Sequence, residues 1–167
     1  MNNRIRTGLI SIAAGLALAT VARAQSDAEA KSLTGVSEVL LVLRAVDASA
    51  GEPAVPVESF RDDIVALLDQ GGVTVLSEED LVGHPGAASL VLTVRSEPVV
   101  KNRIYSIELR VKQLATLVRD PEIQAPVTTW FGGDLGLSPA SDFGEIREAM
   151  KALVVRFVTA RHQVNPD

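Results

Sequence analysis

The apolar residues of this chain follow two different periods, and these periods predict its secondary structure. Residues 39–46, VLLVLRAV, form a near-continuous apolar run that is typical of a strand covered on both faces. From Ser59 the apolar residues recur at helical spacing as far as Gly71-Gly72, which supplies a left-handed stop. Residues 73–76 form a second short strand, and a strand–helix–strand unit of this kind makes its two strands parallel.

Further along the chain, the pattern changes to the alternation of strands that expose one face. Apolar and polar residues alternate over residues 90–95 and again over 104–118, with a turn near residues 101–102. Near Gln113 the apolar residues change parity. This change predicts a β-bulge or a strong bend at that point.

The last third of the chain predicts one more strand and a closing helix. The strand begins over residues 127–131, after a connection that Pro121 and Pro126 bracket, and Gly132-Gly133 is expected to end it. The helix covers about residues 143–162. The complete order is β-α-β-β-β-β-α. It predicts an α+β fold, a two-layer sandwich in which a mixed four- to five-stranded sheet carries two helices on one face.

The first 24 residues have the layout of a secretory signal peptide. Arg4 and Arg6 precede an apolar stretch over residues 7–21, and Ala22-Arg23-Ala24 matches an A-x-A cleavage pattern. The apolar part is shorter than the ~20 residues that a membrane-spanning helix needs. We therefore expect cleavage near Ala24-Gln25, a periplasmic or secreted protein, and no stable membrane span after cleavage.

The mature chain is expected to consist of a flexible lead-in over residues 25–37 and a single α+β domain over residues 38–164. Removing residues 1–24 takes away three arginines, so 13 basic residues remain against 21 acidic ones, a net charge of −8. That acidity argues against nonspecific binding to nucleic acid, which requires basic surface. The absence of cysteine excludes disulfides, thiolate metal sites and cysteine nucleophiles.

Candidate groups for catalysis or metal binding are few. His84 lies in a turn-rich segment, His162 lies near the end of the last helix, and neither has a ligand motif around it. The acidic run over residues 78–80 lacks the alternating oxygen ligands of a calcium loop. No G-x-S-x-G elbow and no phosphate-binding loop is present. We expect no cofactor and no metal, and we leave enzymatic activity open because paired carboxylates have no local signature.

Basic residues concentrate on the central hairpin of this acidic protein. Arg95, Arg110 and Lys112 have the parity of the outward face, and Lys101 and Arg103 lie near the turn. Such a set is typical of a solvated sheet face with cross-strand ion pairs, and it is also what a docking face for a partner requires.

Trp130, in VTTWFGGDLG, is the remaining candidate binding residue. Strand alternation places it either on the outward face near Arg110 or Lys112, or beneath the helices. Because large aromatic side chains are more often buried, we favour the core.

The mature chain resembles small secreted bacterial proteins of unknown activity. The resemblance lies in the charged hairpin followed by TTW at residues 128–130, and in a closing amphipathic helix with RFV at residues 156–158 before Asn165-Pro166. The order of elements is also similar to that of envelope accessory domains, such as the N-terminal domain of the Tol-system propeller protein. The resemblance implies an envelope location and does not by itself imply a function.

These observations predict a non-enzymatic exported domain that binds a protein or another component of the cell envelope, such as the cell wall. Two alternatives stay open: a hydrolase that uses scattered carboxylates, and a carrier of a small ligand held between sheet and helices. The sequence indicates neither the oligomeric state nor the identity of a partner.

Overall fold

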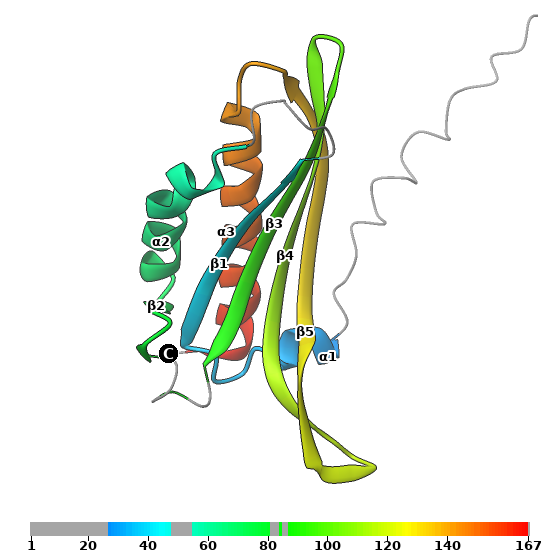
Figure 1. Cartoon of the computed structure of the whole chain (residues 1–167). Coiled ribbons are helices and arrows are strands. Elements are labelled where there is room, and N and C mark those ends of the chain that lie inside the picture. The colour runs from blue at the N-terminus through cyan, green and yellow to red at the C-terminus, as the bar shows by residue number, and fades with distance from the viewer. Residues whose placement is uncertain (1–26, 48–54, 81–83, 85–86, 167) are drawn as a thin grey trace, which may run out of the picture.

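The computed structural model describes residues 27–47, 55–80, 84 and 87–166, and it shows a sheet with helices packed against it (Figure 1). The predicted signal peptide and its cleavage site lie outside the described residues. In chain order the elements are α1 (Asp27–Lys31), β1 (Glu38–Asp47), the 3-10 turn η2 (Val57–Phe60), α2 (Arg61–Gln70), β2 (Thr74–Leu76), β3 (Ala88–Val99), β4 (Asn102–Leu117), β5 (Asp120–Pro139) and α3 (Gly144–Val164).

The sheet is mixed and five-stranded, as predicted. Its strands lie in the order β2-β1-β3-β4-β5, with β1 parallel to both β2 and β3 and with antiparallel pairing from β3 to β5. Helices α2 and α3 lie side by side on one face (Figure 1). The α+β fold class is therefore confirmed. No helix among the described residues combines the length and the apolar character that crossing a bilayer requires.

The core lies between the sheet and these two helices. It is built from alternate residues of the strands and from one stripe of each helix, because only those positions face the other layer. The largest of these buried side chains are Leu90, Leu92, Ile107, Leu109 and Trp130 from the sheet and Ile64, Leu68, Ile146, Met150 and Phe157 from the helices.

The predicted stop after α2 has a distinct cause for each of its two glycines. Gly72 has φ +67°, a left-handed conformation that most side chains adopt only at a cost. At Gly71, a Cβ would lie 2.5 Å from Val158 Cγ1 on α3. Gly72 therefore ends the helix, and Gly71 lets the end of α2 approach α3.

The lead-in differs from the prediction in its described part. Residues 27–31 form the short helix α1, and the following Leu33 and Val36 are both buried in the core. The side chain of Asn165 donates to the Leu33 carbonyl at 3.0 Å and accepts from the Gly35 amide at 2.6 Å. The segment was predicted to be flexible because two apolar residues are too few to show a period. They are enough to hold it against α3.

The hairpin of β4 and β5 is longer than predicted, because β5 begins at Asp120 and includes both Pro121 and Pro126. Proline is tolerated there because β5 is an edge strand and its outer amides need no partner. The predicted irregularity is confirmed: Val111 pairs with Trp130 whereas Lys112 pairs with Thr128. The extra residue of the bulge is therefore Thr129.

Gln113 stabilises this bulge through its side-chain amide. Its Nε2 donates to Thr129 Oγ1 at 2.7 Å and to the Ser32 carbonyl at 2.8 Å. The bulge is thus tied to the turn that follows α1, at the point where the β4–β5 hairpin leaves the helical layer.

Candidate binding surface

The sheet has one face that no helix covers within the described part of the chain. Cross-strand register defines this open face, because Val91, Arg110 and Phe131 lie in one row and Arg95, Ser106 and Leu135 in another. We use the name open face for the outward residues of β1, β3, β4 and β5: Glu38, Leu40, Val42, Arg44, Val46, Ser89, Val91, Thr93, Arg95, Glu97, Ile104, Ser106, Glu108, Arg110, Lys112, Phe131, Gly133, Leu135 and Leu137.

The charged part of the open face is organised around Glu108. Its Oε1 accepts from Arg95 Nη1 at 3.2 Å, and its Oε2 accepts from Arg110 Nη2 at 2.6 Å. Arg110 also lies over the Phe131 ring, with its Cζ 5.9 Å from the ring centroid. Exposed ion pairs of this kind contribute at most about 1 kcal/mol each to stability. Their main effect here is to hold two guanidinium groups against the sheet.

The apolar part of the open face lies beside these charges. Leu135 is 72 % exposed, Leu137 is 59 % exposed, and Phe131 and Ile104 are also exposed. A groove of about 280 Å³ runs between Val46, Arg95, Ile104 and Leu135. Several large apolar side chains therefore meet water together on one side of the sheet, beside a basic cluster, which is the composition of a docking surface rather than of a solvated face.

The sequence-predicted site residues do not all lie on this surface. Arg95, Arg110 and Lys112 do. Lys101 lies at the turn between β3 and β4, where its carbonyl accepts from the Ala140 amide at 3.0 Å. Three of the six predicted binding residues therefore lie on the open face and one lies at the turn. The other two, Arg103 and Trp130, lie elsewhere.

Arg103 and Trp130 are buried on the helix side of the sheet. Arg103 is fully buried, donates through Nη1 to Ser96 Oγ at 2.9 Å, and has its guanidinium 5.4 Å from the Phe143 ring centroid. Its proximity to the turn suggested exposure, but its parity is that of the core residues of β4. Trp130 is 1 % exposed and packs edge-on against Phe157, with the ring centroids 5.7 Å apart. The core assignment of Trp130 is confirmed, and its inclusion among the binding residues is wrong.

Sequence analysis missed the apolar half of the open face. The signal was present, because Phe131, Leu135 and Leu137 share one parity of β5 and so must share one face. Three glycines among these residues obscured the alternation. The predicted strand therefore stopped at Phe131, and the structure continues it to Pro139.

Each glycine of the Gly132-Gly133 pair makes room for an aromatic ring. A Cβ at Gly132 would lie 2.9 Å from Trp130 Cη2, on the core side of β5. A Cβ at Gly133 would lie 3.2 Å from Phe131 Cζ, on the open face. The Trp130 ring therefore lies over Gly132 on the core side of the sheet, and the Phe131 ring lies over Gly133 on the open face.

The outer edge of β5 is occupied along the same stretch. Arg156 of α3 donates through Nη1 to the Gly133 carbonyl at 3.4 Å, and Asp134 Oδ1 accepts from the Leu135 amide at 2.9 Å. Closer to α1, Ser32 Oγ donates to the Thr129 carbonyl at 3.0 Å. A strand added at this edge would have to displace these side chains, so the edge is protected and the open face is the more accessible surface.

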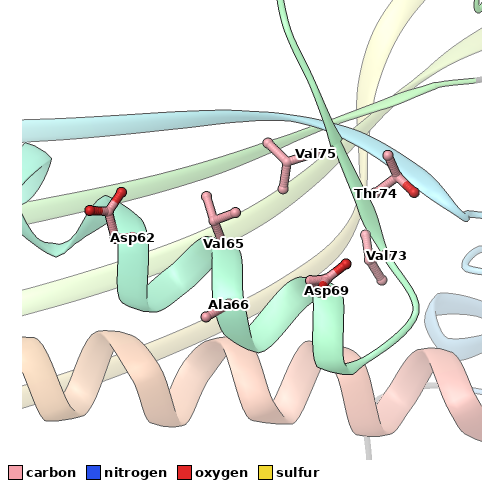
Figure 2. A pocket seen from close by; sticks show the side chains of 7 residues that line it. All are labelled: Asp62, Val65, Ala66, Asp69, Val73, Thr74 and Val75. Carbon is pink, nitrogen blue, oxygen red and sulfur yellow. The ribbon is translucent and has the colours of Figure 1, made fainter.

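A second hollow, of about 380 Å³, lies between α2 and β2 and is lined by Asp62, Val65, Ala66, Asp69, Val73, Thr74 and Val75. Figure 2 shows Asp62 and Asp69 well apart along α2, with Val65 and Val75 between them. The two carboxylates are seven residues apart, and two helical turns separate them by about 10 Å along the axis. They are not placed as a pair.

Two other carboxyls of the described residues have pKa values that do not suit acid catalysis. The pKa of Asp63 is lowered, chiefly by a hydrogen bond from Arg147, and the pKa of Asp80 is lowered by hydrogen bonds from Ser77. A carboxyl that acts as a general acid needs its pKa raised, so neither group gives support to the hydrolase alternative. His84 Nδ1 lies 2.7 Å from Glu38 Oε2. No cluster of three or more metal-type side chains occurs in the described residues.

Comparison with known proteins adds little to this picture. No protein-family model matches the chain, and no curated protein matches its sequence. Among solved structures, a PelC dodecamer from Paraburkholderia phytofirmans is similar over 77 % of this chain and 92 % of its own, with 10 % sequence identity and a TM-score of 0.40. Similarity at this level carries no conclusion about role. The expected likeness to the Tol-system domain stays a prediction, and function has to be inferred from the residues of this chain.

Proposed function

We propose that this protein is an exported domain that binds a protein of the cell envelope through its open face. The observation that carries the proposal is the juxtaposition of exposed Phe131, Leu135 and Leu137 with the Arg95–Glu108–Arg110 cluster on an uncovered sheet. Export is inferred from the signal-peptide pattern of residues 1–24.

The chemistry of the open face suits protein recognition. Fully burying one large aliphatic side chain contributes about 1.5–3 kcal/mol of free energy. Leu135 and Leu137 are largely exposed in the folded chain, so a partner that covers them would gain most of this free energy on binding. Phe131 and Arg110 are of the residue types that most often dominate binding energy at interfaces. Arg110 already lies between Glu108 and Phe131, so it loses less freedom when a partner binds.

The charge of the open face restricts the type of partner. The open face has four basic residues, Arg44, Arg95, Arg110 and Lys112, and three acidic ones, Glu38, Glu97 and Glu108. It is therefore slightly basic on a mature chain whose net charge is −8. A partner surface that is apolar at its centre and acidic at its rim would complement this face. A uniformly basic partner would be repelled by it.

Affinity capture from envelope extract tests the proposal, with residues 25–167 as bait. The variant Arg110→Glu/Lys112→Glu is expected to lose the captured partner, because it reverses the charge of the open face. Arg61→Glu/Lys151→Glu is the matched control, since it makes the same change of charge on α2 and α3, again at residues that pair with glutamates. Unchanged capture by the open-face variant, or equal loss in both variants, contradicts the proposal. Circular dichroism verifies that both variants fold.

A further inference from the structure

The far half of the β4–β5 hairpin extends beyond the helical layer. Figure 1 shows it, in yellow-green, continuing past the end of α3 at the end of the sheet that lies near α1. We call residues 113–128 the arm; it begins at the bulge and ends in the turn at Val118-Arg119. The arm extends past the end of α3, and Leu114, Val118 and Ile123 are 59 %, 100 % and 46 % exposed.

One side of the arm is almost wholly apolar. Ala115 and Ala125 face each other across the two strands, and Gln113 pairs with Val127. By alternation, Leu117 and Ile123 point to the same side. This side continues the core-facing side of the sheet into a region where no core exists, and it has the composition of an interface rather than of a solvent-exposed hairpin.

The arm and the open face are complementary in charge and in character. The arm carries Arg119 against Asp120 and Glu122, a net charge of −1, whereas the open face has a net charge of +1 from four basic and three acidic residues. Each surface also exposes large apolar side chains. The arm of a molecule cannot reach the open face of the same molecule, because both belong to one continuous sheet and the arm points away from the body.

The dimensions of the two surfaces also match. Five residues of strand, from Gln113 to Leu117, span about 17 Å, and the open-face residues of β5 from Phe131 to Leu137 span about 20 Å. Two strands of the arm are about 10 Å wide, and the open face crosses four strands. An arm laid on the open face would thus bury the exposed leucines of the face together with its own Leu117 and Ile123.

We propose that the open face receives the arm of a second copy of this chain. This inference rests on the proposed function of the open face as a protein-binding surface, and it names the partner. The contact is heterologous, because different surfaces of the two copies meet. Each copy can therefore bind two others, through its arm and through its face, to give a ring or a chain. The footprint is small, so association is expected to be weak and dependent on concentration.

Sedimentation velocity on residues 25–167 over a range of concentrations tests this inference. An arm variant, Leu117→Lys/Ile123→Lys, and a face variant, Leu135→Lys/Leu137→Lys, are each expected to weaken self-association at least tenfold. The control Val155→Lys, at an exposed position on α3, is expected to behave like the wild type. Mixing the arm variant with the face variant should restore association, limited to one-to-one pairs, because one intact arm meets one intact face.

A wild-type chain that stays monomeric at every concentration overturns the inference. Association that survives in both variants, or that mixing fails to restore, also overturns it, since the contact is then arm-to-arm, face-to-face or elsewhere. If the wild type stays monomeric while the open-face charge variant still loses an envelope protein in capture, the proposed function stands and only the identity of the partner is wrong.

A second measurement is independent of how the lysine variants fold. The chain contains no cysteine, so Ile123→Cys and Leu135→Cys each introduce a single thiol. On oxidation, a mixture of the two variants should form disulfide-linked heterodimers in several-fold excess over the homodimers of either variant alone. Equal amounts of homodimer and heterodimer would contradict a contact between arm and face.

Discussion

Replacing Gly132 with alanine tests how Trp130 is placed in the core. The added Cβ would lie 2.9 Å from Trp130 Cη2 and 3.5 Å from Leu153 Cδ2, and the first distance is well inside the usual 3.5–4.0 Å of carbon–carbon contact. The indole is 1 % exposed and packs on Phe157, so it has little space to move. Overpacking of this kind costs about 1–3 kcal/mol, and the reduced freedom of the unfolded chain returns roughly 0.5–1 kcal/mol. We expect a net loss of about 1 kcal/mol.

The neighbouring substitution, Gly133→Ala, is the matched control. Its Cβ would meet Phe131 Cζ at 3.2 Å, but that ring is 41 % exposed and can rotate toward solvent. We expect no loss, or a gain of about 0.5 kcal/mol. Urea unfolding followed by the fluorescence of Trp130, the only tryptophan, measures both. With a slope of about 2 kcal/mol per molar, Gly132→Ala should lower the midpoint by roughly 0.5 M. A larger loss for Gly133→Ala than for Gly132→Ala would refute the assignment of faces.

Three further substitutions test other parts of the structure. Val100 has φ +57° and is 96 % exposed, so Val100→Gly should relieve strain without loss of packing and raise the urea midpoint by the equivalent of about 1 kcal/mol; a lower midpoint would show that the turn is not strained. Gln113→Ala removes the hydrogen bonds that fix Thr129, and should cost about 1–2 kcal/mol and speed amide exchange around the bulge; exchange identical to the wild type would contradict this. The pKa of Asp63 is lowered by its hydrogen bond from Arg147, so this pair stabilises the fold at neutral pH and stops doing so as pH falls below about 4. Asp63→Asn should therefore lower Tm at neutral pH, and this difference from the wild type should shrink as the pH falls below about 4; a difference that stays constant down to pH 2 would disprove the effect.

Most of the fold could be predicted because the two periods of the sequence are strong where the core is built. Alternation over residues 104–111 places Arg110 outward, and the helical stripe of α3 places Met150 and Phe157 inward. The change of parity near Gln113 predicted the bulge, although the extra residue lies on the partner strand, at Thr129. A change of parity shows that two strands go out of register and does not show which strand holds the insertion.

The predictions that were wrong share one cause. In each of them, the type of residue and the nearby turn signals were given more weight than the alternation of side chains along the strand. Arg103 was placed with the surface because it is basic and near a turn, yet it has the parity of core residues and is buried against Phe143. Pro121 and Pro126 indicated a loop, but an edge strand accepts proline. The glycines after Phe131 indicated the end of a strand, and they instead accommodate aromatic rings. The contact of Arg103 with Phe143 joins segments 40 residues apart, whereas each glycine contacts a ring only two residues earlier.

The apolar half of the open face could not be predicted from the sequence alone. Leu135 and Leu137 alternate correctly, but nothing local shows that the helices cover the opposite face of β5. That fact depends on the parity of Trp130, which the bulge at Thr129 sets. The candidate surface therefore became complete only when the register of β5 against β4 was known.

Site-specific photo-crosslinking measures directly which surface of this protein is occupied. A benzophenone amino acid placed at Leu135 probes the open face, and the same residue placed at Val155 probes the exposed side of α3. In cells that produce the full chain, we predict that position 135 gives a discrete crosslinked product and that position 155 gives none. Crosslinks from position 155 with none from position 135 would contradict the claim that the open face is the binding surface.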